Sequence, residues 1–144
     1  MMRKYDNADE FMSLNSEKFG NIQIAGQALS SPSKLSTTGM PLQESERLSY
    51  VFLDLVNQCT DLLFGLSASA AIAKSKYKKE EAIAYRVADG RVKDKEFTAV
   101  SGDEYMKWLQ NHADLSDIHA YLSMKHADFE KAHFYYKQLM GSNK

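Results

Sequence analysis

Two rows of side chains repeat every seven residues in the C-terminal third of the chain. Large apolar or aromatic side chains form one row: Trp108, Leu115, Leu122, Phe129 and Tyr136. All four histidines of the chain form the other row: His112, His119, His126 and His133. Two neighbouring rows with this repeat are typical of a helix that lies along a second helix. The pattern therefore predicts a long helix that begins at the capping-box sequence Ser101–Glu104 and ends near Met140.

A partner for this helix is predicted upstream, from Leu42 to the Asp89-Gly90 dipeptide. Apolar residues recur there at steps of three and four, and glycine is a helix stop because it tolerates left-handed backbone. The small residues of Leu66–Ser75 favour a close approach of two helices. The connection, Arg91–Val100, is short and has room for one helical turn around Phe97. The expected fold is all-α, a long antiparallel helical hairpin.

The N-terminal region, residues 1–43, is predicted to be an irregular arm or linker, and residues 44–144 a hairpin domain for DNA binding and oligomerisation. Between Gly20 and Gln43 lie both prolines, many Ser and Thr residues and no aromatic residue. The alternation of Ile22 and Ile24 is a weak sign of an extended segment. Ahead of it, Asp9–Phe19 is expected to form a short helix.

A hairpin of two helices encloses no core, so other apolar surface must cover it. We expect several copies of the chain to assemble into a homo-oligomeric bundle or ring. The interface is expected at the two seven-residue rows. The alternative is a monomer in which the N-terminal arm folds back as a third layer.

No pattern in the sequence indicates an enzyme, a metal site or a cofactor. The histidines are about 10.5 Å apart along a helix axis, too far to share one metal ion within a chain. They are expected to be neutral and hydrogen-bonded in the seam. The alternative is an ion bound across subunits, with one histidine from each copy. Cys59 is the only cysteine, which excludes a disulfide within the chain. No apolar stretch is suited to a signal peptide or a membrane span, so a cytoplasmic protein is expected.

Positive charge gathers between Ala73 and Glu96. Eight cationic side chains oppose five carboxylates there, a local net charge of +3 in a chain whose net charge is −1. Cations that neutralise phosphates, with tyrosines that stack on bases, suit single-stranded nucleic acid. The expected contacts are Lys74, Lys76, Tyr77, Lys78, Lys79, Tyr85, Arg86, Arg91 and Lys93. The alternative is a solvated helix end with ion pairs such as Lys76 with Glu80.

The segment from Ala70 to Phe97, AAIAKSKYKKEEAIAYRVADGRVKDKEF, followed by the helix from Asp103, resembles the phage UvsY-type recombination mediators. In that family the basic helix end binds single-stranded DNA, and the C-terminal helix assembles a ring. The complex helps to load a RecA-like recombinase onto a strand covered by single-strand-binding protein. The resemblance implies DNA contact at Lys74, Lys76, Lys78, Lys79, Arg86 and Arg91, and oligomer contacts along the Trp108 row.

These inferences converge on a non-enzymatic, single-stranded-DNA-binding accessory factor in recombination or replication. If a phage encodes it, it is expected in the cytoplasm of the host bacterium. The alternative function is a helical protein-interaction module, such as a phage inhibitor of a host or defence protein, or a structural adaptor.

Overall fold

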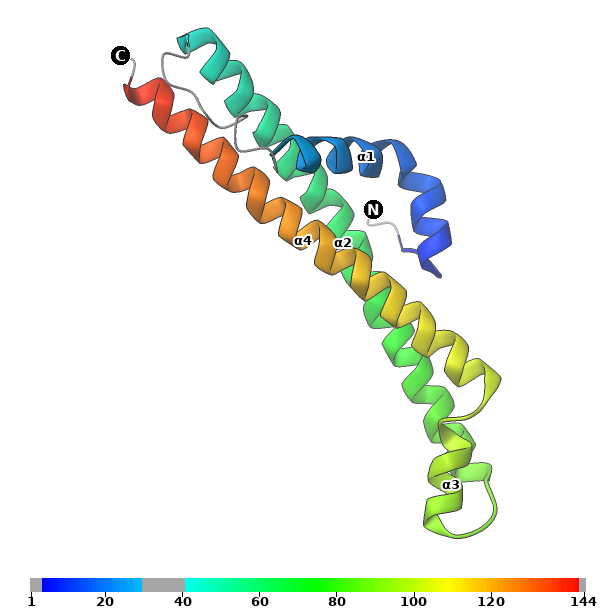
Figure 1. Cartoon of the computed structure of the whole chain (residues 1–144). Coiled ribbons are helices and arrows are strands. Elements are labelled where there is room, and N and C mark those ends of the chain that lie inside the picture. Colours follow the sequence, from blue (N-terminus) through cyan, green and yellow to red (C-terminus); the bar gives the residue numbers. More distant parts are fainter. Residues whose placement is uncertain (1–3, 30–40, 143–144) are drawn as a thin grey trace. The chain divides into compact units, whose positions relative to one another are not determined.

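The computed structural model of the chain describes residues 4–29 and 41–142, and these form four helices (Figure 1). The two long helices, α2 and α4, pack against each other in antiparallel directions, which confirms the predicted all-α hairpin. The chain divides into two compact units, the first from Met1–Phe11 and Phe64–His119, the second from Met12–Leu63 and Ala120–Lys144. The helices are α1 (Ala8–Leu29), α2 (Leu42–Val87), α3 (Val92–Ala99) and α4 (Asp103–Ser142).

The first unit joins the C-terminal part of α2 to the beginning of α4. Leu66 and Leu115 are fully buried in it. The small side chain of Ser69, also buried, connects the N-terminal segment to α2. Its Oγ accepts a hydrogen bond from the backbone N–H of Tyr5 at 2.6 Å and donates one to the carbonyl of Gly65 at 2.7 Å. A small residue at this position therefore leaves room for a backbone to approach α2.

The second unit is a three-helix core. Phe19 of α1 packs against Tyr121 of α4, with ring centroids 5.5 Å apart. On the other side, Phe52 of α2 stacks on Tyr136 at 5.7 Å and packs near Phe129 at 6.1 Å. Cys59 is completely buried in this unit. The N-terminal region thus supplies the third layer that the hairpin lacks here.

The helix expected at Asp9–Phe19 is confirmed, and the prediction of an irregular N-terminal arm is wrong for residues 20–29, which continue this helix to Leu29. Phe11 and Ile22 are fully buried, whereas Ile24 is 69% exposed, so their spacing follows a helix face and no extended segment forms. Asn15 interrupts the helix with non-helical backbone angles (φ −125°, ψ 20°), and α1 bends there. The predicted linker residues 30–40 lie outside the described residues.

The connection between the long helices differs in detail from the prediction. Gly90 has a φ of +114°, in agreement with its predicted role as a stop. The following segment is the eight-residue helix α3 and not a single turn. The predicted capping box is wrong, because the Ser101 hydroxyl donates to the carbonyl of Thr98 at 3.3 Å and α4 begins at Asp103. Gly102 instead accepts the first bond of α4, from the N–H of Met106 at 2.9 Å.

Both seven-residue rows of α4 lie along α2 within one chain. Leu115, Leu122 and Phe129 are completely buried and Tyr136 is 2% exposed, while Trp108 is half-buried. Packing within the chain therefore accounts for the apolar row without a second copy. A contact of these residues with another copy stays a prediction.

The four histidines are half-buried at the edge of this seam. His119 Nε2 lies 2.9 Å from the Ser67 hydroxyl. His133 Nδ1 lies 2.8 Å from the carbonyl of Ser49 and 3.2 Å from its hydroxyl. The carbonyl can only accept, so Nδ1 of His133 carries a proton in this pair. Hydrogen bonding of these two histidines to α2 agrees with the role expected for them in the seam.

Replacing Leu122 with Ala should lower the free energy of unfolding by about 2–5 kcal/mol, because a fully buried leucine leaves a cavity. Urea denaturation followed by circular dichroism measures the change. Met124 of the same helix is 57% exposed, and Met124→Ala should change stability by no more than about 0.5 kcal/mol. Equal losses in both variants would contradict the assignment of the core face of α4.

The thiol of Cys59 should react very slowly in the folded protein. Burial raises the pKa of Cys59 to about 11, and the thiolate is the reactive form. At pH 8 the thiolate fraction should be lower than in the unfolded chain by about 100-fold, in addition to the steric barrier. Colour release from a disulfide reagent, measured with and without urea, tests this. Equally fast reaction in both conditions would show that the thiol is accessible.

Candidate nucleic-acid interface

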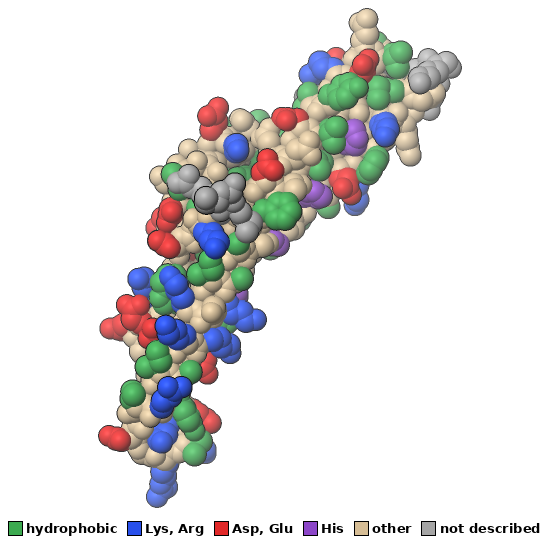
Figure 2. Space-filling model, turned by 180° about the vertical axis from the view of Figure 1, so that it is seen from behind, with side chains coloured by type: hydrophobic (Ala, Val, Ile, Leu, Met, Phe, Trp, Pro, Cys, Tyr) green, Lys and Arg blue, Asp and Glu red, His purple; other side chains and the backbone are tan. Residues whose placement is uncertain are grey.

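Nine Lys and Arg side chains lie between Lys74 and Lys107 in the first unit, and together they define the cationic end. Figure 2 shows Lys and Arg side chains gathered over the part of the molecule that contains α3, with acidic and apolar side chains among them. All seven cations predicted to bind nucleic acid are exposed: Lys74, Lys76, Lys78, Lys79, Arg86, Arg91 and Lys93. The helix ends therefore bring this charge to the surface.

Few of these cations are neutralised within the chain. Among the residues that the structure describes, the only ion pair in the cationic end joins Lys78 Nζ to Glu81 at 3.9 Å. The ion pair considered between Lys76 and Glu80 does not form. Lys76 Nζ instead lies 4.0 Å from the centre of the Trp108 ring. Of the ion pairs that the alternative of a solvated helix end would require, the described residues thus show only Lys78 with Glu81.

The aromatic side chains of the cationic end have two different roles. Tyr77 is half-buried and packs edge-on against Tyr105 (5.9 Å, 89°) and His112 (5.6 Å) of α4. Its ring belongs to the contact between α2 and α4. Tyr85 is 39% exposed, and Lys95 Nζ lies 5.9 Å from the centre of its ring. Of the two predicted stacking residues, Tyr85 alone presents an accessible ring.

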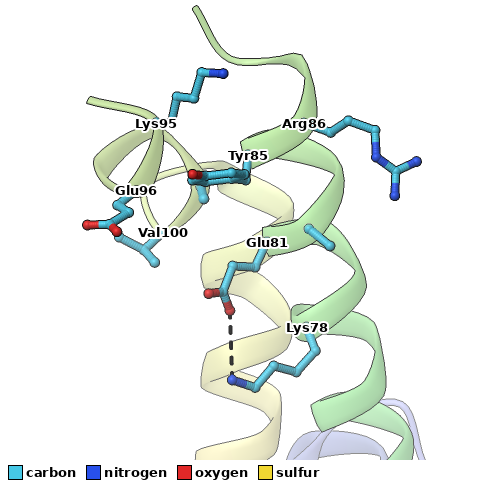
Figure 3. A pocket seen from close by; sticks show the side chains of 9 residues that line it. Lys78, Glu81, Tyr85, Arg86, Lys95, Glu96 and Val100 are labelled. Carbon is cyan, nitrogen blue, oxygen red and sulfur yellow. Dashed lines mark ion pairs between the residues drawn. The ribbon is translucent and has the colours of Figure 1, made fainter. Parts of the chain in front are cut away.

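A cleft of about 600 Å³ separates the end of α2 from α3, and we call it the α2–α3 cleft. Figure 3 shows the ring of Tyr85 between the two helices, Glu81 and Lys78 paired on α2, and Arg86 directed to the opposite side. The lining residues are Lys78, Glu81, Ala82, Tyr85, Arg86, Lys95, Glu96, Ala99 and Val100. The cleft combines an aromatic ring, apolar walls and charges of both signs.

Folding adds two cations to the predicted set. Lys95 of α3 lines the α2–α3 cleft, and Lys107 of α4 lies 5.1 Å from the centre of the Trp108 ring. Lys95 belongs to the basic stretch and could have been included on charge alone. Lys107 is separated from that stretch in the sequence, and only the antiparallel packing of α4 on α2 brings it near Lys76.

The charge of the cationic end is modest. Its nine cations stand beside seven carboxylates, which leaves a local net charge of +2. Binding to a polyanion through such a surface depends on direct contacts with phosphates and falls steeply with salt. Three large apolar side chains are also highly exposed here: Val87 (73%), Phe97 (72%) and Val92 (60%).

The described residues contain no group of three or more His, Cys, Asp or Glu side chains placed to hold a metal ion. Within residues 4–29 and 41–142, no helix has the length and apolar character needed to cross a bilayer. No protein-family model matches the chain, and comparisons with curated proteins and with solved structures gave no match either.

Proposed function

We propose that the chain is a non-enzymatic accessory protein that binds single-stranded DNA through its cationic end. The observation that carries this proposal is that eight of its nine cations form no ion pair within the described part of the chain. Exposed cations without a carboxylate partner can neutralise phosphates and release counterions at little internal cost. The exposed ring of Tyr85 supplies a surface for stacking an unpaired base.

The biological setting in the proposal is recombination or replication. Its support is the resemblance of the basic stretch and the final helix to the UvsY-type mediators. A RecA-like recombinase and a single-strand-binding protein are then the expected protein partners.

Assembly of several copies belongs to the same proposal. A local net charge of +2 binds a strand weakly, and repetition of the cationic end in an oligomer would multiply that contact. Because most of the apolar row of α4 is buried inside each chain, we expect exposed apolar side chains outside the row to contribute to the contact between copies. Phe64 on α2 (63% exposed) and Phe134 on α4 (52% exposed) are available.

The double variant Lys78→Ala/Lys79→Ala should bind every single-stranded oligonucleotide more weakly, because both lysines are exposed in the cationic end. Loss of two phosphate contacts should make the slope of log affinity against log salt concentration less negative by about 1.4. Fluorescence anisotropy of a labelled oligonucleotide at several salt concentrations measures both effects.

The matched control is Lys131→Ala/Lys137→Ala, which removes two exposed lysines from α4 in the second unit. It should leave the affinity and its salt dependence close to those of the unaltered protein. If both double variants behave alike, or if a folded Lys78/Lys79 variant binds normally, the cationic end is not the binding surface.

A protein-interaction module is the second candidate, and the exposed apolar side chains Val87, Val92 and Phe97 favour it. A contact made by such side chains with a groove on another protein responds little to salt. The same titration separates the two functions. Absence of DNA binding at low salt would favour a protein partner, such as a host or defence protein inhibited by a phage, or an assembly joined by an adaptor.

A further inference from the structure

The α2–α3 cleft contains more than a phosphate site needs. Besides cations, it is lined by the carboxylates of Glu81 and Glu96. Carboxylates repel phosphates, so a surface that only followed a phosphate backbone would gain nothing from them. Carboxylates accept hydrogen bonds well, and their presence points to a ligand that also donates hydrogen bonds.

Both carboxylates can accept hydrogen bonds from a ligand. Glu81 has a single ion pair, with Lys78 at the long distance of 3.9 Å, and its side chain is 37% exposed. Glu96 is exposed, and its carboxylate has no ion pair within the residues that the structure describes. Neither group is neutralised by a close partner.

The other walls of the cleft suit a flat ring. Tyr85 presents its ring between α2 and α3, and the side chains of Ala82, Ala99 and Val100 supply apolar surface (Figure 3). The volume of about 600 Å³ lies within the usual range for small-ligand sites. Lys95, with its ammonium group 5.9 Å from the Tyr85 ring centre, places positive charge beside a base stacked there.

We propose that the α2–α3 cleft receives one unpaired base of the bound strand and prefers bases that carry an exocyclic amino group. The base stacks on Tyr85, its amino group donates to Glu81 or Glu96, and Lys78 and Lys95 contact the adjoining phosphates. Cytosine offers its N4 amino group to a carboxylate, whereas thymine presents a carbonyl oxygen at the same position. This preference for amino-bearing bases rests on the proposed function, and it adds selectivity among bases to the proposed binding of single-stranded DNA.

The test compares oligonucleotides of deoxycytidine and thymidine of equal length and label by fluorescence anisotropy at pH 7.5. Both pyrimidine strands stack weakly, so strand stiffness contributes little to the difference. Deoxycytidine strands should bind more tightly by at least about fivefold, the lower end for one specific base contact. Equal affinities, or tighter binding of thymidine strands, would overturn the preference and leave DNA binding intact. No binding of either strand would overturn the proposed function as well.

The variant Glu81→Gln/Glu96→Gln identifies the groups responsible. Loss of two negative charges should strengthen binding of both strands, while the ratio of their affinities falls toward one. The control, Glu80→Gln/Glu104→Gln, removes two charges from the same unit outside the cleft lining. It should strengthen binding and keep the ratio. If the two double variants change the ratio equally, general electrostatics explains it and the carboxylates do not select the base.

Tyr85 has its own pair of variants. Tyr85→Leu should weaken binding of both strands several-fold because a stacked base loses its aromatic partner, whereas Tyr85→Phe should bind normally. Circular dichroism checks that both variants are folded. Normal binding by a folded Tyr85→Leu protein would show that no base stacks in the cleft.

Discussion

The structure depends on the burial of one apolar row of α4 against α2. Leu115, Leu122 and Phe129 have no exposed surface, and full burial of each such side chain stabilises the fold by about 1.5–3 kcal/mol. Because this row fixes how α4 runs along α2, it also determines which residues meet at the surface. Lys76 of α2 reaches the Trp108 ring of α4 for this reason, and Lys107, the sequence neighbour of Trp108, thereby joins the cationic end. The cationic end thus combines the basic stretch of α2 and α3 with one cation that helix register adds.

A single seam between two long helices leaves much of the surface of each helix uncovered. The N-terminal region, including α1, covers part of that surface. Phe19 and Ile22 bury their side chains in the second unit, and in the first unit the backbone of Tyr5 is held by Ser69. The sequence allows two ways to cover the hairpin, by other copies of the chain or by its own N-terminal region. The structure shows the second, because the N-terminal region packs on the hairpin. Phe64 of α2 and Phe134 of α4 stay exposed, and the association of copies stays a prediction.

The long helices were predictable because their signals are local and repeated. The seven-residue rows indicate the extent and the buried face of α4, and the short connection after Gly90 indicates its antiparallel direction. The helix expected at Asp9–Phe19 is present, but its continuation to Leu29 is not predicted by the sequence, because Gly20 and Gly26 are more typical of a linker. Gly26 is explained by packing, because a Cβ there would lie 3.1 Å from Cδ and Cε of Lys125.

The different exposure of the two tyrosines in the cationic end depends on the position of α4. Tyr77 packs on that helix, whereas Tyr85 does not and is exposed. The approach of Lys125 to Gly26 and the contact of Tyr77 with Tyr105 cannot be inferred from residue spacing, because each joins segments that are distant in the sequence.

The weak attachment of α3 has a consequence for recognition. Ala99 is its one buried residue, and no side chain caps its first turn at Arg91. A helix held by so few contacts opens or shifts at a smaller free-energy cost than the core does. A small movement of α3 would change the width of the α2–α3 cleft. Under the proposed function, such a movement would let the same walls receive bases of different size and would make release of a bound strand faster.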